Sequence, residues 1–134
     1  MEGHDESGEA RKLMIVESDT KMQDLLRALF KKRGYRVLVI SDPERVFQRF
    51  YEDSQMADVL LVSAGNLGAA AVTMFNRLGE ESATKHVPAV LLLGDQQGGW
   101  QDQGGLGPQR AVIQMPLKSR QLREAILGVL RGEG

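Results

Sequence analysis

Five short apolar runs recur along this chain, and they constrain its fold more than any other feature of the sequence. Each run holds five to seven residues, is rich in valine, leucine or isoleucine, and is bounded by polar or turn-forming residues. Strands that are buried on both faces of a sheet have this pattern, because neither face carries a polar set of side chains. We therefore expect strands at residues 12–16, 35–40, 57–63, 88–93 and 111–115.

Segments with a helical period separate most of these runs. After the first run, Thr20 and Gln23 have the spacing of a capping box, and Gly34 marks the end of the helix. Five apolar residues between them fall on one helical stripe, which predicts the buried face. They are Met22, Leu25, Leu26, Leu29 and Phe30.

Three further helices are expected on similar grounds. Asp42 and Pro43 provide a cap and a first-turn proline for the second helix. Its predicted inner face holds Val46, Phe47, Phe50 and Tyr51. A third helix is expected over residues 67–78, and a last one from a Ser119 cap to near Gly132.

The segment between the fourth and fifth runs does not show the helical period of the other connecting segments. Residues 94–110 contain six glycines and one proline, and Trp100 and Leu106 are their only large apolar residues. Each glycine in a helix interior costs roughly 1 kcal/mol relative to alanine. The fourth crossover helix is therefore expected to be degenerate or missing.

Strands that alternate with helix-length crossovers predict a parallel sheet with helices on both faces. For five strands, a doubly wound, flavodoxin-like α/β fold with strand order 2-1-3-4-5 is the expected arrangement. Residues 12–131 would form this single domain, with a disordered tail at 1–11 and a short tail at 132–134.

Composition limits the classes of function. The formal net charge is -1 with both signs interspersed, so we expect no contact with nucleic acid or a membrane surface. The chain has no cysteine, and no apolar run approaches the ~18 residues of a membrane span. Its first residues are acidic rather than a secretory signal, so a cytoplasmic location is expected. No motif predicts a cofactor.

In such a sheet the ligand crevice lies at the carboxyl ends of the first and third strands. Glu17, Ser18 and Asp19 follow the first strand, and residues 63–66 follow the third. At these points "LMIVESD", "ADVLLVS", "VPAVLLLG" and "VIQMPLKSRQL" resemble, in order, strands one, three, four and five of the CheY-like response-regulator receivers. The resemblance covers residues 12 to about 131 and implies a role in two-component signal transduction.

The resemblance also places substitutions at the positions that serve phosphorylation. Ser63 stands at the phosphoacceptor aspartate, Leu93 at the hydroxyl residue, Met115 at the lysine and Val112 at the aromatic switch. A serine lacks the carboxylate nucleophile, and methionine cannot neutralise a phosphoryl charge. The resemblance therefore implies a pseudo-receiver that is not an enzyme. It also suggests a cis bond between Met115 and Pro116.

Several alternatives stay open. Of the acidic cluster only Glu17 and Asp19 remain, with Ser18 between them, and these two carboxylates either hold a divalent cation or cap the first helix. Ser63 is either a kinase substrate or a hydrogen-bonding strand end. A displaced phosphoacceptor would be Asp95 rather than Asp58, which lies at the wrong end of its strand. A flavin or nucleotide site is opposed by the carboxylates of the ESDTK loop (17–21).

The resemblance further implies that another signalling protein is the partner. Receivers commonly signal through their fourth helix, fifth strand and fifth helix, which here would use Trp100, Leu106, Arg120 and Arg123. Trp100 is either such a contact or an anchor folded onto the sheet edge. The domain is expected to form part of a longer signalling chain.

Overall fold

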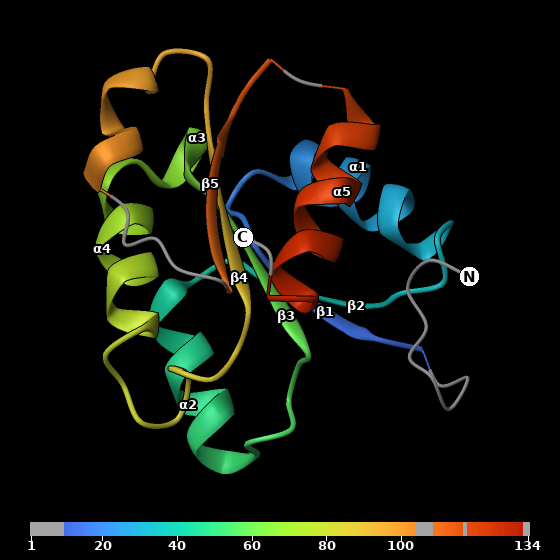
Figure 1. The fold of residues 1–134 in the computed structure, drawn as a ribbon, viewed down its shortest axis with the longest axis vertical. Helices are drawn as coiled ribbons and strands as arrows, with labels where there is room; N and C mark the ends of the chain where they lie inside the picture. The colour runs from blue at the N-terminus through green and yellow to red at the C-terminus, as the bar shows by residue number, and fades with distance from the viewer. Residues whose placement is uncertain (1–9, 104–108, 117, 133–134) are drawn as a thin grey trace.

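Backbone hydrogen bonds join the five apolar runs into one parallel sheet. The computed structural model describes residues 10–103, 109–116 and 118–132. The strands are β1 (Lys12–Val16), β2 (Arg36–Ile40), β3 (Val59–Ser63), β4 (Ala89–Leu93) and β5 (Arg110–Gln114). Their order is β2-β1-β3-β4-β5 and every pairing is parallel, which confirms the predicted fold (Figure 1).

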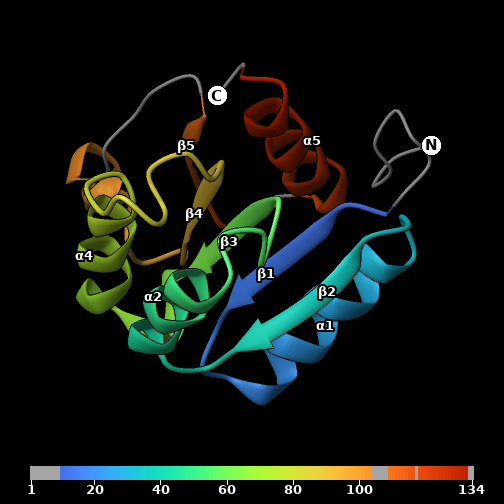
Figure 2. The ribbon, with the colours of Figure 1, turned by 90° about the horizontal axis from the view of Figure 1, so that it is seen from below.

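Helices cover both faces of this sheet, and Figures 1 and 2 show α1 and α5 on one side with α2 and α4 on the other. Their bounds are α1 (Thr20–Lys31), α2 (Pro43–Glu52), α3 (Ala64–Leu67), α4 (Ala69–Leu78) and α5 (Ser119–Leu130). The crossover from β4 to β5 contains a short 3₁₀ helix, η1 (Gly98–Gln103), in place of a full α-helix. The expectation of a degenerate fourth crossover helix is therefore confirmed.

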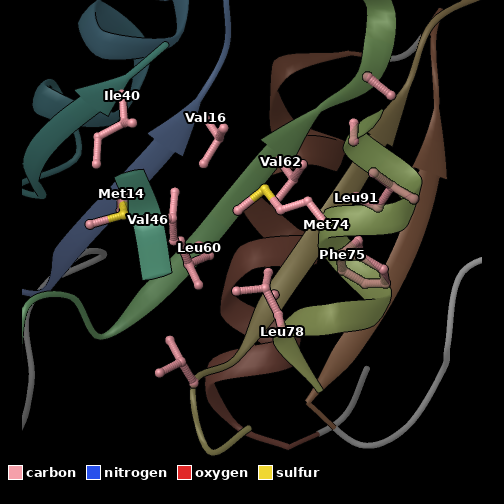
Figure 3. Packing of buried hydrophobic residues seen from close by; sticks show 14 of the residues in the cluster. Met14, Val16, Ile40, Val46, Leu60, Val62, Met74, Phe75, Leu78 and Leu91 are labelled. Atoms are coloured by element: carbon pink, nitrogen blue, oxygen red, sulfur yellow. The ribbon is translucent and has the colours of Figure 1, made fainter. Parts of the chain in front are cut away.

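Alternate residues of each strand supply two separate cores. On the α2/α4 side, Met14 and Val16 of β1 pack with Leu60 and Val62 of β3 and with Phe75 of α4 (Figure 3). On the α1/α5 side, the intervening strand residues pack against α1 and α5. The sheet is therefore buried on both faces, as the unbroken apolar runs predict.

Two helix caps differ from the prediction by one residue. Asp19, rather than Thr20, is the N-cap of α1, and its Oδ2 accepts a hydrogen bond from the Met22 N–H at 2.9 Å. A carboxylate is a strong acceptor for the free N–H groups of a first turn. At α5 the cap is Lys118 and Ser119 is the first helical residue, because the Gln121 side chain accepts the Lys118 N–H at 2.7 Å.

Two residues predicted on inner helix faces are exposed. Leu25 of α1 is 67% exposed and Tyr51 of α2 is 61% exposed. Each is adjacent to a buried residue, Leu26 or Phe50, and lies about 100° further round its helix. The contact with the sheet is narrower than the apolar stripe, so these flanking side chains reach solvent.

The predicted helix at 67–78 divides at Gly68. This residue has φ 65° and ψ -144°, which ends α3 and starts α4. Only glycine adopts this region without strain. The break lets α3 begin directly after β3, where Ala64 is fully buried.

The crossover between β4 and β5 is anchored by its tryptophan. Trp100 is half-buried and packs against the core on the α2/α4 side. Leu106 lies outside the described residues. The Met115–Pro116 peptide bond is cis, as the resemblance suggested.

Both expected tails lie mostly outside the described residues, at 1–9 and 133–134. Of the rest, Ala10 forms a β-bridge and the Arg11 carbonyl accepts the Arg36 N–H at 2.9 Å. Within the described ranges, no helix is long and apolar enough to cross a membrane.

Gly68 and Gly128 form a matched pair for testing the helix break. Gly68→Ala should lower the free energy of unfolding by about 1–3 kcal/mol, because alanine is strained at this φ and ψ. Gly128→Ala should raise it by about 0.5–1 kcal/mol, since Gly128 lies inside α5 with open space at its Cβ position. Urea unfolding followed by the fluorescence of the single tryptophan, Trp100, measures both. Equal effects of the two substitutions would contradict this account of the break.

Candidate functional site

The candidate site lies at the carboxyl ends of the strands, where the fold brings the predicted residues to one edge of the sheet. Glu17 directly follows β1, Ser63 ends β3 and Leu93 ends β4. Met115 follows β5, and its N–H donates to the Leu93 carbonyl at 2.8 Å. The parallel register therefore places all four positions along the same crevice.

Glu17 is the centre of this site. Its side chain is fully buried, and Oε1 accepts two hydrogen bonds of 3.0 Å, from the Asp19 N–H and from Nδ2 of Asn66. Its other oxygen, Oε2, is also buried and has no hydrogen-bond partner within the described part of the chain. Half of the carboxylate is thus satisfied by N–H donors from two different loops.

The neighbours of Glu17 in the first loop are exposed and serve local structure. Asp19 caps α1 through Oδ2, and Ser18 is exposed. Nε2 of Gln23 donates to the Glu17 carbonyl at 2.5 Å and to Oγ of Ser41 at 3.0 Å. For Asp19, the capping interpretation is therefore the one that its contacts support.

A second amide side chain closes the opposite part of the crevice. Oε1 of Gln97 accepts the Gly94 N–H at 2.7 Å, while its Nε2 donates to the Ala64 carbonyl at 2.9 Å. Gln97 thereby joins the loop after β4 to the start of α3. The two backbones approach closely here, since a Cβ built on Gly94 would lie 3.3 Å from the Cα of Gly65.

The residues at the other phosphorylation positions belong to the cores. Ser63 is almost fully buried and Leu93 is fully buried within the α2/α4-side core. Met115 is partly buried and packs against the core on the other face of the sheet, and Val112 packs against the α2/α4-side core. Leu93 and Met115 therefore contribute to apolar packing on opposite faces.

The described residues offer a divalent cation one open buried carboxylate oxygen at this edge of the sheet, Oε2 of Glu17. Mg²⁺ takes six oxygens in near-octahedral geometry, usually with one or two carboxylates. Here Oε1 of Glu17 already accepts two N–H groups and the Asp19 carboxylate caps a helix. Among the described residues, no group of three or more His, Cys, Asp or Glu side chains is placed to hold a metal ion.

The two displaced carboxylates lie at opposite ends of the sheet. Asp58 is at the amino end of β3, where its Oδ2 accepts the Lys12 N–H at 2.7 Å. This confirms that Asp58 is remote from the crevice. Asp95 is exposed on the loop after β4, at the edge that carries Glu17 and Ser63.

A hollow of about 520 Å³ lies at the opposite end of the sheet, beside the last turns of α4 and α5. Lys85, Arg110 and Arg131 line it. The Arg110 guanidinium donates to backbone carbonyls, including that of Gln109 at 3.1 Å, and burial lowers its pKa. Cations are favourable where helix carbonyls are unpaired, so these contacts account for the basic residues without a ligand.

The hydrogen bonds that close the crevice were not predicted from the sequence. Asn66 was expected at this edge within residues 63–66, but its bond to Glu17 and the bond of Gln97 to Ala64 span 49 and 33 residues and have no local motif. On the expected partner surface, Arg120 is exposed and pairs with Glu124 at 3.1 Å, while Arg123 is partly buried. The role of these side chains in binding stays a prediction.

Glu17 variants test whether the crevice depends on hydrogen bonds or on charge. Glu17→Ala should lower the free energy of unfolding by about 2–4 kcal/mol, because it removes an acceptor shared by two donors. Glu17→Gln keeps an acceptor oxygen and should stay within about 1 kcal/mol of the wild type. Chemical unfolding in EDTA measures both. An equally large loss for the glutamine variant would show that the charge itself is required.

No protein-family model matches this chain, and no curated protein sequence matches it. Solved structures do resemble it. A provisionally assigned response regulator from Chloroflexus aurantiacus J-10-fl has TM-score 0.77 and 20% identity, covering 90% of this chain and 98% of its own. A sensor protein from Polaromonas sp. JS666 has TM-score 0.74 and 14% identity, covering 92% and 98%.

A third structure is the receiver domain of the sensor histidine kinase PA1611 from Pseudomonas aeruginosa PAO1, solved with a magnesium ion in its active-site cleft. It has TM-score 0.67 and 18% identity, and it covers 90% of this chain and 98% of its own. At these identities the likeness is one of fold. The chain therefore has the five-stranded parallel fold of response-regulator receiver domains.

Proposed function

We propose that this domain is a pseudo-receiver, a receiver-like module that acts in signal transduction through protein contacts and is not phosphorylated in its crevice. The observation that carries the proposal is the closed crevice. The neutral amide side chains of Asn66 and Gln97 tie α3 to the loops after β1 and β4, and Glu17 is the one buried carboxylate among the described residues there. An aspartyl phosphorelay needs a carboxylate nucleophile and cationic partners for the phosphoryl group.

The chemistry of Ser63 supports the same conclusion. A serine hydroxyl becomes a nucleophile when an adjacent base takes its proton. Ser63 is 2% exposed and ends a strand between apolar neighbours, Leu61 and Val62 being fully buried before it. Met115 and Leu93 add apolar packing instead of a positive charge and a hydroxyl. With Val112 at the position of the aromatic switch, the resemblance thus implies that four parts of the phosphorylation machinery are replaced together.

Signalling would then run through the surface formed by η1, β5 and α5. Arg120 and Arg123 of α5 offer cationic groups on one face of the sheet, and Trp100 lies half-buried against the core on the other, α2/α4 face. Tryptophan and arginine are enriched at protein interfaces. The partner in this proposal is another signalling protein, met in the cytoplasm, and the domain belongs to a longer multidomain chain.

The competing function is that of a receiver phosphorylated on a displaced carboxylate. Asp95 is the candidate, because it is exposed on the crevice edge of the sheet. Nε2 of Gln114 donates to the backbone carbonyl of Asp95 at 3.5 Å, and the exposed Asp95 side chain forms no ion pair within the described residues.

An amide NMR spectrum recorded before and after Mg²⁺, and then with beryllofluoride as a phosphoryl mimic, tests the proposal. The amides of Glu17, Ser63 and Met115 should not shift, because the described residues offer Mg²⁺ a single open buried carboxylate oxygen, Oε2 of Glu17, and no group of three or more His, Cys, Asp or Glu side chains. A saturable shift at these residues that extends to Val112 would overturn the pseudo-receiver assignment.

Acetyl phosphate with Mg²⁺, followed by intact-mass measurement, separates the two functions. The wild-type chain should gain no phosphoryl group. If it does gain one, Asp95→Asn should abolish the adduct and Asp58→Asn should not, since Asp58 lies at the far end of the sheet. That pattern would establish the displaced phosphoacceptor in place of the pseudo-receiver.

A further inference from the structure

The outer edge of β2 combines open backbone groups, an exposed leucine and unpaired arginines. Among the described residues, β2 is an edge strand that pairs with β1 alone. The Arg36 N–H donates to Arg11 and the Ile40 carbonyl accepts from Glu17, so Arg36 and Ile40 face β1. The N–H and C=O groups of successive residues in a strand point toward opposite edges of that strand. The N–H and C=O groups of Val37 and Val39 therefore point outward, away from the sheet.

Leu38 lies at the centre of this edge. It is 38% exposed, and its register partner Met14 places it on the α2 side of the sheet. Two hollows adjoin it: one of about 180 Å³, also lined by Arg36 and Met56, and one of about 210 Å³, also lined by Arg45 and Arg49. The edge thus presents an exposed apolar side chain, Leu38, between two shallow hollows whose walls include arginines.

Of the basic residues of these walls, Arg49 lies in the last turn of α2, where a cation is favourable to the helix dipole. Arg45 and Arg49 are exposed at i and i+4 of α2, a spacing at which like charges are mildly destabilising. Within the described residues, neither has an ion pair. The nearby Glu44 is taken by Arg77 at 2.9 Å, and Asp42 is engaged in capping α2 through the Glu44 N–H at 3.0 Å.

We propose that this edge, defined by Arg36, Leu38, Arg45 and Arg49, binds an extended acidic peptide segment of a partner protein by strand addition. The segment would pair with the outward groups of Val37 and Val39 and place an apolar side chain over Leu38. Its carboxylates would meet the three arginines, which have no acidic partner of their own in the described chain.

Charge complementarity favours an acidic strand over a second copy of the chain or an uncharged strand. A second copy of the chain would bring the same three arginines to the interface, and like charges would oppose pairing. An uncharged strand would leave the arginines unmatched. The chain's own residues 1–9 are acidic, with Glu2, Asp5, Glu6 and Glu9, and are therefore the competing occupant that the experiment must separate.

The test uses the full chain and blocked peptides of about six residues, a usual strand length. A peptide that alternates glutamate and valine should shift the amides of Val37, Leu38 and Val39 saturably. Lysine in place of glutamate should abolish the shifts, because it opposes the arginines. N-methylation of the peptide backbone on one edge should also abolish them, because strand addition needs those N–H groups. Binding that survives N-methylation would overturn strand addition.

Arginine variants test the charge component. Arg45→Gln with Arg49→Gln should weaken binding of the glutamate–valine peptide about 2- to 30-fold, the range expected for the loss of two exposed ion pairs. The matched control, Lys31→Gln with Lys32→Gln, makes the same change in net charge at the end of α1 and should leave the affinity unchanged. Equal weakening by both pairs would show a general charge effect and contradict the proposed site.

Two further outcomes would assign the edge to another occupant. Replacing the four acids of residues 1–9 by their amides should leave the β2 amides and the peptide affinity unchanged. Shifted β2 amides together with tenfold tighter peptide binding would show that the chain's own tail is the occupant. Concentration-dependent shifts without peptide would show a second copy. These measurements report on the β2 edge and not on the crevice. A negative result here would therefore leave the pseudo-receiver proposal standing.

Discussion

The burial of β3 on both faces is the constraint on which the rest of the structure depends. All five residues of β3 are buried, and they alternate between the two cores. Each fully buried Val or Leu side chain contributes roughly 1.5–3 kcal/mol relative to exposure. This central strand can lie only between β1 and β4, with helices above and below it. Its last residue, Ser63, is consequently held in a rigid edge, and the loops that form the crevice leave from fixed points.

The crevice is closed by neutral amides where a phosphorelay site would need charges. A cluster of carboxylates repels itself until a cation binds, so such a site stays open and metal-dependent. Here one oxygen of Glu17 is satisfied by two N–H donors, and Gln97 bridges the loops after β3 and β4 with a donor and an acceptor. The loops are therefore joined without any cation. Under the proposed function, this geometry holds the loops in a fixed arrangement and does not support phosphorylation chemistry.

The sequence predicts the parts of this structure that depend on periodic burial. Strands buried on both faces follow from unbroken apolar runs, the strand order follows from the doubly wound fold expected for five such strands, and the poor fourth crossover helix follows from its glycines. The predictions are wrong where the outcome depends on a single residue. Asp19 rather than Thr20 caps α1, and Gly68 forms a helix break instead of lying inside a helix. The Glu17–Asn66 bond spans 49 residues, and Gln97 lies in a segment without any period. Contacts of this kind depend on where the finished sheet places its loops, and no local pattern encodes them.

A closed crevice has a consequence for how the proposed module could be regulated. A ligand shifts a conformational equilibrium only by its differential affinity for two states. If the crevice admits neither phosphoryl group nor cation, it offers no such ligand, and binding at the β2 edge or at the α5 surface is constitutive. Control must then act on the contact itself. An edge that recognises carboxylates through exposed arginines is sensitive to ionic strength and to any change in the charge of the partner segment. Regulation of such a module would therefore lie in its partner and not in its own fold.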